Sequence, residues 1–252
     1  MEVEKMIFPE WTTGNIILYG FLALLALGVA PLELNGKAMM AYSKFRQARG
    51  IPARLGMFIL YFAPILALYI SARDYLPHAS LIQWVVFLSV LIHFAKRVLE
   101  SLFLHRYSGP IGLFTTALIA VFYSFASFLI GYLNRNPIET PDVWFYLGGV
   151  LFITGIAGNF IHHKILADLR KNSLDYFIPK NGLFKYVACP HYLFEIFTWT
   201  GIFLFSRHLG AALTLSFIVM YLSARSVRTL QWYKEKFADF PPNVKALIPF
   251  VL

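Results

Sequence analysis

The sequence predicts an all-α fold, a polytopic membrane bundle of about seven transmembrane helices. Hydrophobic residues make up 58% of the 252 and charged residues only 14%, which is more apolar surface than a soluble domain of this size can bury. The apolar residues fall in runs long enough to cross a bilayer, and the Lys and Arg residues alternate between the loops that join these runs. No internal repeat is visible, so residues 1–252 are expected to form a single integral-membrane domain.

Each predicted span is an apolar run of about 20 residues or slightly less, the length that crosses the hydrocarbon core as a helix. The first run ends at Asn35-Gly36, the fourth at Asn134-Arg135-Asn136-Pro137, and Pro179-Lys180-Asn181-Gly182 precedes the sixth, all of which are turn sequences. The sixth and seventh runs are the shortest. In chain order the predicted spans are 14–33, 56–72, 80–95, 112–133, 143–163, 192–205 and 209–224.

The basic residues orient these spans. All but four of the 22 Lys and Arg fall in the loops after the first, third and fifth spans or in the tail after the seventh; the four others are Lys5, Arg73, Arg135 and Arg207. Because Lys and Arg remain in cytosolic loops, we expect a lumenal or outside amino terminus and a cytosolic carboxyl terminus. The long cytosolic segments, about 164–191 and 225–252, could hold a soluble cofactor.

Polar residues recur at helical spacing on four otherwise apolar segments, all at the cytosolic end. Such groups are expensive in hydrocarbon and indicate a functional site. Tyr61, about seven residues into the second span, lies roughly 10 Å below the same surface. The sequence therefore predicts one pocket with a basic roof and apolar walls. The four sets are His93, Lys96, Arg97 and Glu100; Asn159, His162 and His163; His191 and Glu195; Arg225 and Arg228.

A pocket of this kind suits a soluble polyanion together with a lipid, and NADPH with a lipid substrate fits. Arg and Lys donate directed hydrogen bonds to phosphates, although these residues could equally be ordinary positive-inside anchors. Lys96 and Glu100 could be a structural i, i+4 salt bridge. The candidates for covering the pyrophosphate and 2'-phosphate are Arg170, Lys171, Arg225 and Arg228.

Several other kinds of chemistry find little support. The net charge of +9 is spread over membrane loops without a soluble module, so nucleic-acid binding is not expected. The seven His residues show neither HxxxH nor HxxHH spacing, and no metal centre is expected. Cys189 is the only cysteine, and no GxSxG elbow is present, which argues against a thiolate metal site and a serine hydrolase.

Four stretches carry specific motifs: HFAKRVLESLFLHRYSG (93–109), GNFIHHKILADLR (158–170), DYFIPKNGLFKYVACPHYLFEI (175–196) and WYKEKFADFPPNVKALIPFVL (232–252). On these motifs the chain resembles the steroid 5α-reductase and trans-2-enoyl-CoA reductase superfamily, integral-membrane enzymes that use NADPH to reduce a C=C bond conjugated to a carbonyl. The resemblance covers essentially the whole chain, and Asn35-Gly36-Lys37 and Tyr42-Ser43-Lys44-Phe45 look like its plant-type branch.

The resemblance also implies site residues, most of them in the C-terminal half, about 150–252. His163 stands where steroid reductases tend to have Asp. Steroid reductases grip the ketone with a Gln-Glu pair and a Tyr, and the aligned residues here are Leu60, Tyr61 and Phe94. The implied cofactor contacts are Asn159, Arg170, Tyr176, Glu195, Arg225 and Tyr233, with Arg97 beside them and His191 where several relatives have Asn.

Conjugate reduction needs a hydride, a donor to the developing enolate oxygen and a proton for the α-carbon. Because the family's carboxyl group is missing, we expect Tyr61 and Tyr192 to be the oxyanion donors. A phenol with a pKa near 10 donates without ionising at neutral pH, and a cation such as Lys96 or Arg97 beside it would make it a better acid.

The predicted function is NADPH-dependent reduction of a 3-oxo-Δ4 steroid in the endoplasmic-reticulum membrane. Very-long-chain trans-2-enoyl-CoA reduction remains an alternative, because the HFAKR string is closer to the enoyl-CoA reductases while the YFIPKNGLF stretch is closer to the steroid reductases. A membrane methyltransferase that uses S-adenosylmethionine, or a non-catalytic lipid-binding relative, would share the architecture.

Overall fold

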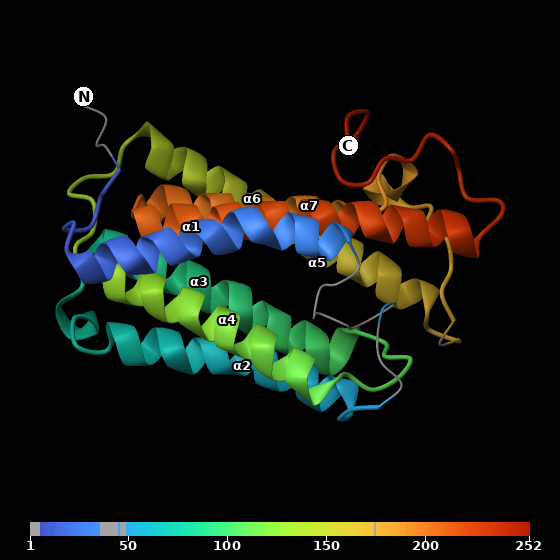
Figure 1. Cartoon of the computed structure of the whole chain (residues 1–252), viewed down its shortest axis with the longest axis horizontal. Coiled ribbons are helices and arrows are strands. Elements are labelled where there is room, and N and C mark those ends of the chain that lie inside the picture. Colours follow the sequence, from blue (N-terminus) through green and yellow to red (C-terminus); the bar gives the residue numbers. More distant parts are fainter. Residues whose placement is uncertain (1–5, 36–44, 46–48, 174) are drawn as a thin grey trace.

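The computed structural model describes residues 6–35, 45, 49–173 and 175–252, which form an all-α bundle without a strand in that part of the chain (Figure 1). The loop residues Gly36, Lys37, Tyr42, Ser43, Lys44 and Arg46 lie outside the described residues. Seven α-helices confirm the predicted spans. They are α1 (Thr13–Leu34), α2 (Ala53–Ala72), α3 (Leu81–Leu99), α4 (Leu113–Leu133), α5 (Val143–Leu169), α6 (Pro190–Ser206) and α7 (Leu209–Lys236).

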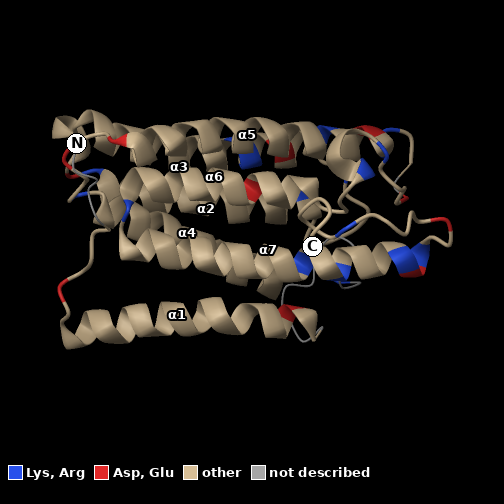
Figure 2. Cartoon of the chain, turned by 90° about the horizontal axis from the view of Figure 1, so that it is seen from above, with Lys and Arg blue, Asp and Glu red and all other residues tan. Residues whose placement is uncertain are grey.

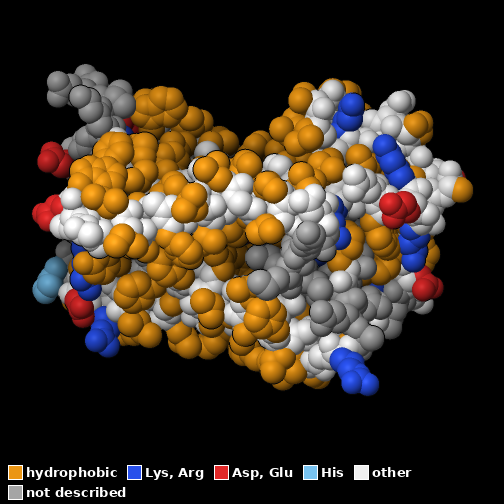
Figure 3. All heavy atoms as spheres, in the orientation of Figure 1, with side chains coloured by type: hydrophobic (Ala, Val, Ile, Leu, Met, Phe, Trp, Pro, Cys, Tyr) orange, Lys and Arg blue, Asp and Glu red, His pale blue; other side chains and the backbone are white. Residues whose placement is uncertain are grey.

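The helices have the length and surface of membrane spans. All except α6, which has 17 residues, are long and apolar enough to cross a bilayer. Figure 3 shows hydrophobic side chains over most of the visible helical surface, and Figure 2 shows many of the Lys and Arg residues toward the end of the bundle where α7 ends and the C-terminal segment follows it. The protein is therefore a multi-pass membrane protein.

Three helices extend beyond the predicted spans on this same side. The third span was expected to end at residue 95, but α3 continues to Leu99 and then into a π-helical turn, η3 (Glu100–Leu104). The fifth and seventh helices likewise continue to Leu169 and Lys236. Hydropathy places the boundary where charged residues begin, whereas the helical hydrogen bonds continue past these charges. On α3 the charges of Lys96 and Arg97 pair with Glu100 inside the bundle, but Lys164 and Asp168 on α5 are exposed.

Glycines allow the closest helix contacts, which join α5 to α6 and α2 to α4. A Cβ on Gly155 would lie 2.4 Å from the Thr198 backbone nitrogen, and one on Gly201 would lie 2.6 Å from the Gly148 carbonyl oxygen. Small residues let membrane helices approach closely and gain dispersion energy. The pairing of α5 with α6 fixes the two helices that carry Asn159, His191 and Glu195, three of the predicted cofactor residues.

A buried ion pair closes the opposite end of the bundle. Asp142 caps α5 by accepting from the Trp144 and Phe145 N–H groups, and it receives two hydrogen bonds, of 2.8 and 3.0 Å, from Arg207. Burial alone would raise the pKa of Asp142, but the Phe145 N–H and the guanidinium hold it below its ordinary value. Arg207, one of the four basic residues predicted for this side, thus joins α5 to the turn between α6 and α7.

Candidate active site

A cavity of about 270 Å³ opens at the end of the bundle where α3 and α5 end and α6 begins. Its deeper wall is apolar and includes Phe122, Phe217 and Ile218, while its outer part carries cationic and aromatic side chains. Of the phosphate candidates, Lys171, Arg225 and Arg228 do not line it, and neither do His93, Lys96, Glu100 and His162 of the four polar sets. The residues predicted for cofactor binding or catalysis that do line it are Tyr61, Arg97, Asn159, Arg170, Tyr176, His191, Tyr192, Glu195 and Tyr233.

Arg97 contacts three side chains at the polar end of the cavity. Its Nη2 donates to the Tyr61 hydroxyl at 2.5 Å, and its Nη1 donates to Oε2 of Glu100 at 2.5 Å. The same Nη1 lies 2.8 Å from Nδ1 of His163. A planar guanidinium can serve several partners in fixed directions. Arg97 therefore orients the Tyr61 hydroxyl and neutralises a buried carboxylate at once.

A second set of contacts joins α3, α5 and α6. Lys96 Nζ lies 2.8 Å from Oε1 of Glu100 and also donates to the side-chain oxygen of Asn159. Asn159 in turn donates to Oε2 of Glu195 at 3.1 Å. The other oxygen of Glu195 accepts from the Trp199 indole at 3.3 Å. The polar residues that the sequence placed on separate spans thus form one connected network.

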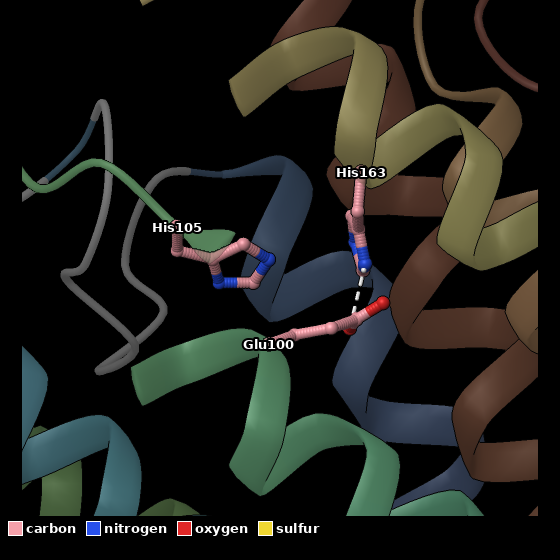
Figure 4. Close-up of side chains that lie close together, drawn as sticks. All are labelled: Glu100, His105 and His163. Atoms are coloured by element: carbon pink, nitrogen blue, oxygen red, sulfur yellow. Dashed lines mark hydrogen bonds and ion pairs between the residues drawn. The ribbon is translucent and has the colours of Figure 1, made fainter. Parts of the chain in front are cut away.

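Glu100, His105 and His163 have the composition of a divalent-metal site, since their ligand atoms lie within 4.8 Å of one another (Figure 4). Arg97, however, contacts both the Glu100 oxygen and the His163 nitrogen that a metal would need. Burial lowers the pKa of His105 well below its usual range, and the nearby His163 and Arg97 act in the same direction. We assign Glu100 and His163 to the Arg97 network, and the expectation of no metal centre remains a prediction.

His162, which the sequence grouped with His163, has a structural role. Its Nδ1 lies 2.7 Å from the Gly158 carbonyl oxygen, and its Nε2 accepts from the Leu183 N–H at 3.2 Å. Its ring stacks on Phe194 at 5.1 Å between centroids. His162 therefore anchors the short 3₁₀ turn η4 (Gly182–Lys185) to α5 and does not line the cavity.

The outer rim combines a cation with aromatic rings. The Arg170 guanidinium lies 4.6 Å from the centroid of the Tyr176 ring, and its Nη1 donates to the Arg106 carbonyl at 2.7 Å. Trp232 packs edge-on against Tyr176 at 5.0 Å. This part of the cavity offers positive charge and aromatic faces together, which suits a phosphorylated aromatic ligand.

Arg225 and Arg228 are engaged elsewhere. Both donate to Oε1 of Glu33 on α1, at 2.8 and 3.0 Å, and Glu33 is fully buried. The Phe45 ring lies 4.4 and 4.5 Å from the two guanidinium carbons. The pair therefore joins α1 to α7, and its predicted contact with cofactor phosphates remains a prediction. The sequence interpretation missed Glu33, although it is a lone carboxylate at the end of an apolar span.

Two of the residues that align with the family's carbonyl contacts do not reach the cavity. Phe94 and Leu60, which align with family carbonyl contacts, are 0% and 1% exposed and do not line the cavity. Tyr123 on α4 does line it, and its ring stacks on Tyr61 with centroids 6.0 Å apart. Nothing local in the sequence distinguishes Tyr123, because its position depends on how α2 packs against α4.

Comparisons with known proteins agree with these features. Residues 110–252 match the family model described as 3-oxo-5-alpha-steroid 4-dehydrogenase. The chain is 34% identical over 262 residues to 3-oxo-5-alpha-steroid 4-dehydrogenase 1 of Mus musculus, with 100% of both chains covered. It is 31% identical to the human protein of that name, over 90% of this chain and 92% of the relative.

A very-long-chain enoyl-CoA reductase of Dictyostelium discoideum is also similar, with 31% identity over 178 residues, 69% of this chain and 59% of the relative. The family resemblance inferred from the motifs is therefore confirmed. The chain belongs to the 3-oxo-5-alpha-steroid 4-dehydrogenase family and is a membrane oxidoreductase that acts on CH–CH groups.

Proposed function

We propose that the protein uses NADPH to reduce a C=C bond conjugated to a carbonyl, with a 3-oxo-Δ4 steroid as its substrate. The observation that carries the proposal is a single cavity with cationic and aromatic groups at its mouth, an apolar wall within and a phenol held by Arg97 between them. The protein would act in the endoplasmic-reticulum membrane, with a lumenal amino terminus and a cytosolic carboxyl terminus, as its basic loops favour.

The residues at the polar end suit the cofactor. When bound, NADPH supplies the hydride. Arg170 and Tyr176 would hold its charged and aromatic parts, while Asn159 and Glu195 form the hydrogen-bonding surface next to the apolar wall. His191, Tyr233 and Arg97 complete the lining on this side, and Arg225 and Arg228 would add positive charge from α7.

Tyr61 and Tyr192 would stabilise the carbonyl oxygen and deliver the proton. The Tyr61 oxygen accepts a hydrogen bond from Arg97, which favours donation of the phenolic proton toward another acceptor because positive charge strengthens the acid. Tyr192 lies on α6 in the same cavity, one residue after His191. The apolar wall beside these phenols would lower the local polarity once substrate and cofactor fill the cavity, and such hydrogen bonds act most strongly in that environment.

Tyr61→Phe and Tyr192→Phe test these roles. Each should lower turnover by about 10²-fold or more and leave NADPH binding unchanged, measured by enone reduction and by NADPH fluorescence in detergent micelles. Tyr69→Phe on the same helix as Tyr61 is the control, because Tyr69 is 58% exposed on the outer face. Full activity in both variants would exclude the assignment.

A very-long-chain enoyl-CoA is the second candidate substrate, favoured by the similarity to the Dictyostelium enoyl-CoA reductase. Both substrates present a carbonyl conjugated to a double bond, so the same tyrosines would serve. Product formation from enoyl-CoAs and from 3-oxo-Δ4 steroids, measured on one preparation, decides between them.

A further inference from the structure

Lys96 and Glu100 form a buried ion pair at the centre of the network. Their side chains are only 13% and 3% exposed, and the charged atoms lie 2.8 Å apart. A salt bridge at i, i+4 contributes little on a helix surface, and burying one costs desolvation energy. Stability of α3 alone therefore does not account for this pair, and its other contacts indicate what it does.

Lys96 fixes the direction of the Asn159 amide. Lys96 Nζ donates to Oδ1 of Asn159, while Nδ2 of Asn159 donates to the His191 carbonyl at 2.8 Å and to Glu195 at 3.1 Å. An ammonium group only donates, and a carbonyl and a carboxylate only accept. If the amide were flipped, its NH₂ group would face the Lys96 ammonium, and its oxygen would face the His191 carbonyl and the Glu195 carboxylate. Only the observed orientation satisfies every partner.

Glu100 joins this amide to the proposed proton donor. Its Oε1 pairs with Lys96, and its Oε2 accepts from Arg97 at 2.5 Å. Arg97 uses its other terminal nitrogen to donate to Tyr61. The Glu100 carboxylate therefore sets the distance between Lys96, which contacts Asn159, and Arg97, which contacts Tyr61.

We propose that Lys96 and Glu100 are a positioning pair, in which Lys96 orients Asn159 and Glu195 toward the cofactor and Glu100 holds that surface in register with Tyr61. The inference rests on the proposed function, since it assigns the network to hydride and proton delivery. An error of about 1 Å between reacting groups can cost about 10² in rate, so a pair that touches no substrate can still control turnover.

Lys96→Met is the direct test. Methionine follows the lysine side chain as far as Cε and removes its charge, while Oε2 of Glu100 retains Arg97 and His163 at 2.5 and 3.0 Å, so the carboxylate stays paired through that oxygen. We expect the variant to fold, to keep the KM for the lipid within about twofold and to lose about 10- to 100-fold in kcat. Its deuterium isotope effect with 4-deuterated NADPH should increase, because hydride transfer becomes rate-limiting, and its NADPH Kd should rise.

The matched control is Lys164→Met, which removes an equivalent i, i+4 pair. Lys164 and Asp168 lie 2.6 Å apart on α5 but are 56% and 60% exposed. This variant should match the wild type in kcat, isotope effect and NADPH Kd. A Lys96→Met enzyme that behaves like the Lys164→Met enzyme would overturn the proposal.

A double-mutant cycle with Asn159→Ala shows whether Lys96 acts through Asn159. If it does, the double variant is no slower than Asn159→Ala alone, whereas fully additive losses overturn the proposal. If the wild type reduces no enone or enoyl substrate, the proposed function fails separately. NADPH binding then decides the positioning role: weaker binding by Lys96→Met than by Lys164→Met supports it, and equal binding overturns it.

Discussion

Glu33 illustrates how single charged residues are accommodated in this membrane protein. A charge inside a span is expensive unless it is paired, and Glu33 on α1 is fully buried against Arg225 and Arg228 on α7. Desolvation offsets much of the attraction in such a pair, but removing one partner leaves the other charge uncompensated. For the stability of the protein, the ion pair therefore matters more than either charged residue alone.

Glu33→Gln should lower the free energy of unfolding by about 3–5 kcal/mol, because the two guanidinium groups lose their shared carboxylate. Unfolding by sodium dodecyl sulfate in mixed micelles, followed by circular dichroism, measures this change. Glu235→Gln removes an exposed carboxylate from α7 and should be neutral. Equal stability of the two variants would show that the Glu33 contacts do not join α1 to α7.

At the scale of helices, the close pairing of α5 and α6 determines the geometry of the site. Gly148, Gly155 and Gly201 bring the two backbones together, and the same two helices carry Asn159 and Glu195, which hydrogen-bond to each other at 3.1 Å. A change in the distance between the helices would separate these side chains before it disrupted the rest of the bundle.

Gly155→Ala should therefore weaken both stability and activity. The added Cβ would meet the Thr198 backbone nitrogen at 2.4 Å, and backbone cannot move aside as a flexible side chain can. We expect a loss of about 1–3 kcal/mol in stability and a lower kcat, measured by detergent unfolding and turnover. Gly149→Ala on the same helix meets nothing within 4 Å and should be harmless, since Ala favours a helix more than Gly does; a similar loss there would show that the loss in Gly155→Ala does not come from packing against Thr198.

For the molecule as a whole, the sequence predicted where the helices lie in the chain better than it predicted which side chains on different helices contact one another. Hydropathy and basic loops predicted the spans, and helical spacing placed Lys96, Arg97 and Glu100 on one face at the same end as Asn159, because both patterns are local properties of the chain. That Arg97 binds Tyr61, or that Glu33 binds Arg225, depends on which helices pack together, and no local pattern encodes this.

The sequence also did not predict where α3 ends or that Tyr123 lines the cavity. The π turn η3 after α3 has no sequence signature, yet it carries Glu100 toward Arg97. Tyr123 enters the cavity only because α4 packs on α2. The family resemblance identified several of the polar cavity-lining residues in advance, including Asn159, Arg170 and Glu195, because position in a motif carries tertiary information that periodicity does not.

Transfer of a hydride from NADPH to an unsaturated carbonyl lipid in this cavity can be followed by the mass of the product formed with NADPH that carries deuterium at both C4 positions. The purified protein in lipid nanodiscs would be given 3-oxo-Δ4 steroids and enoyl-CoAs. We expect the wild type to form a saturated product that carries one deuterium and one solvent hydrogen, and Tyr61→Phe to form much less of it. Saturated product without deuterium, or no product from either substrate class, would rule out hydride transfer from NADPH in this cavity.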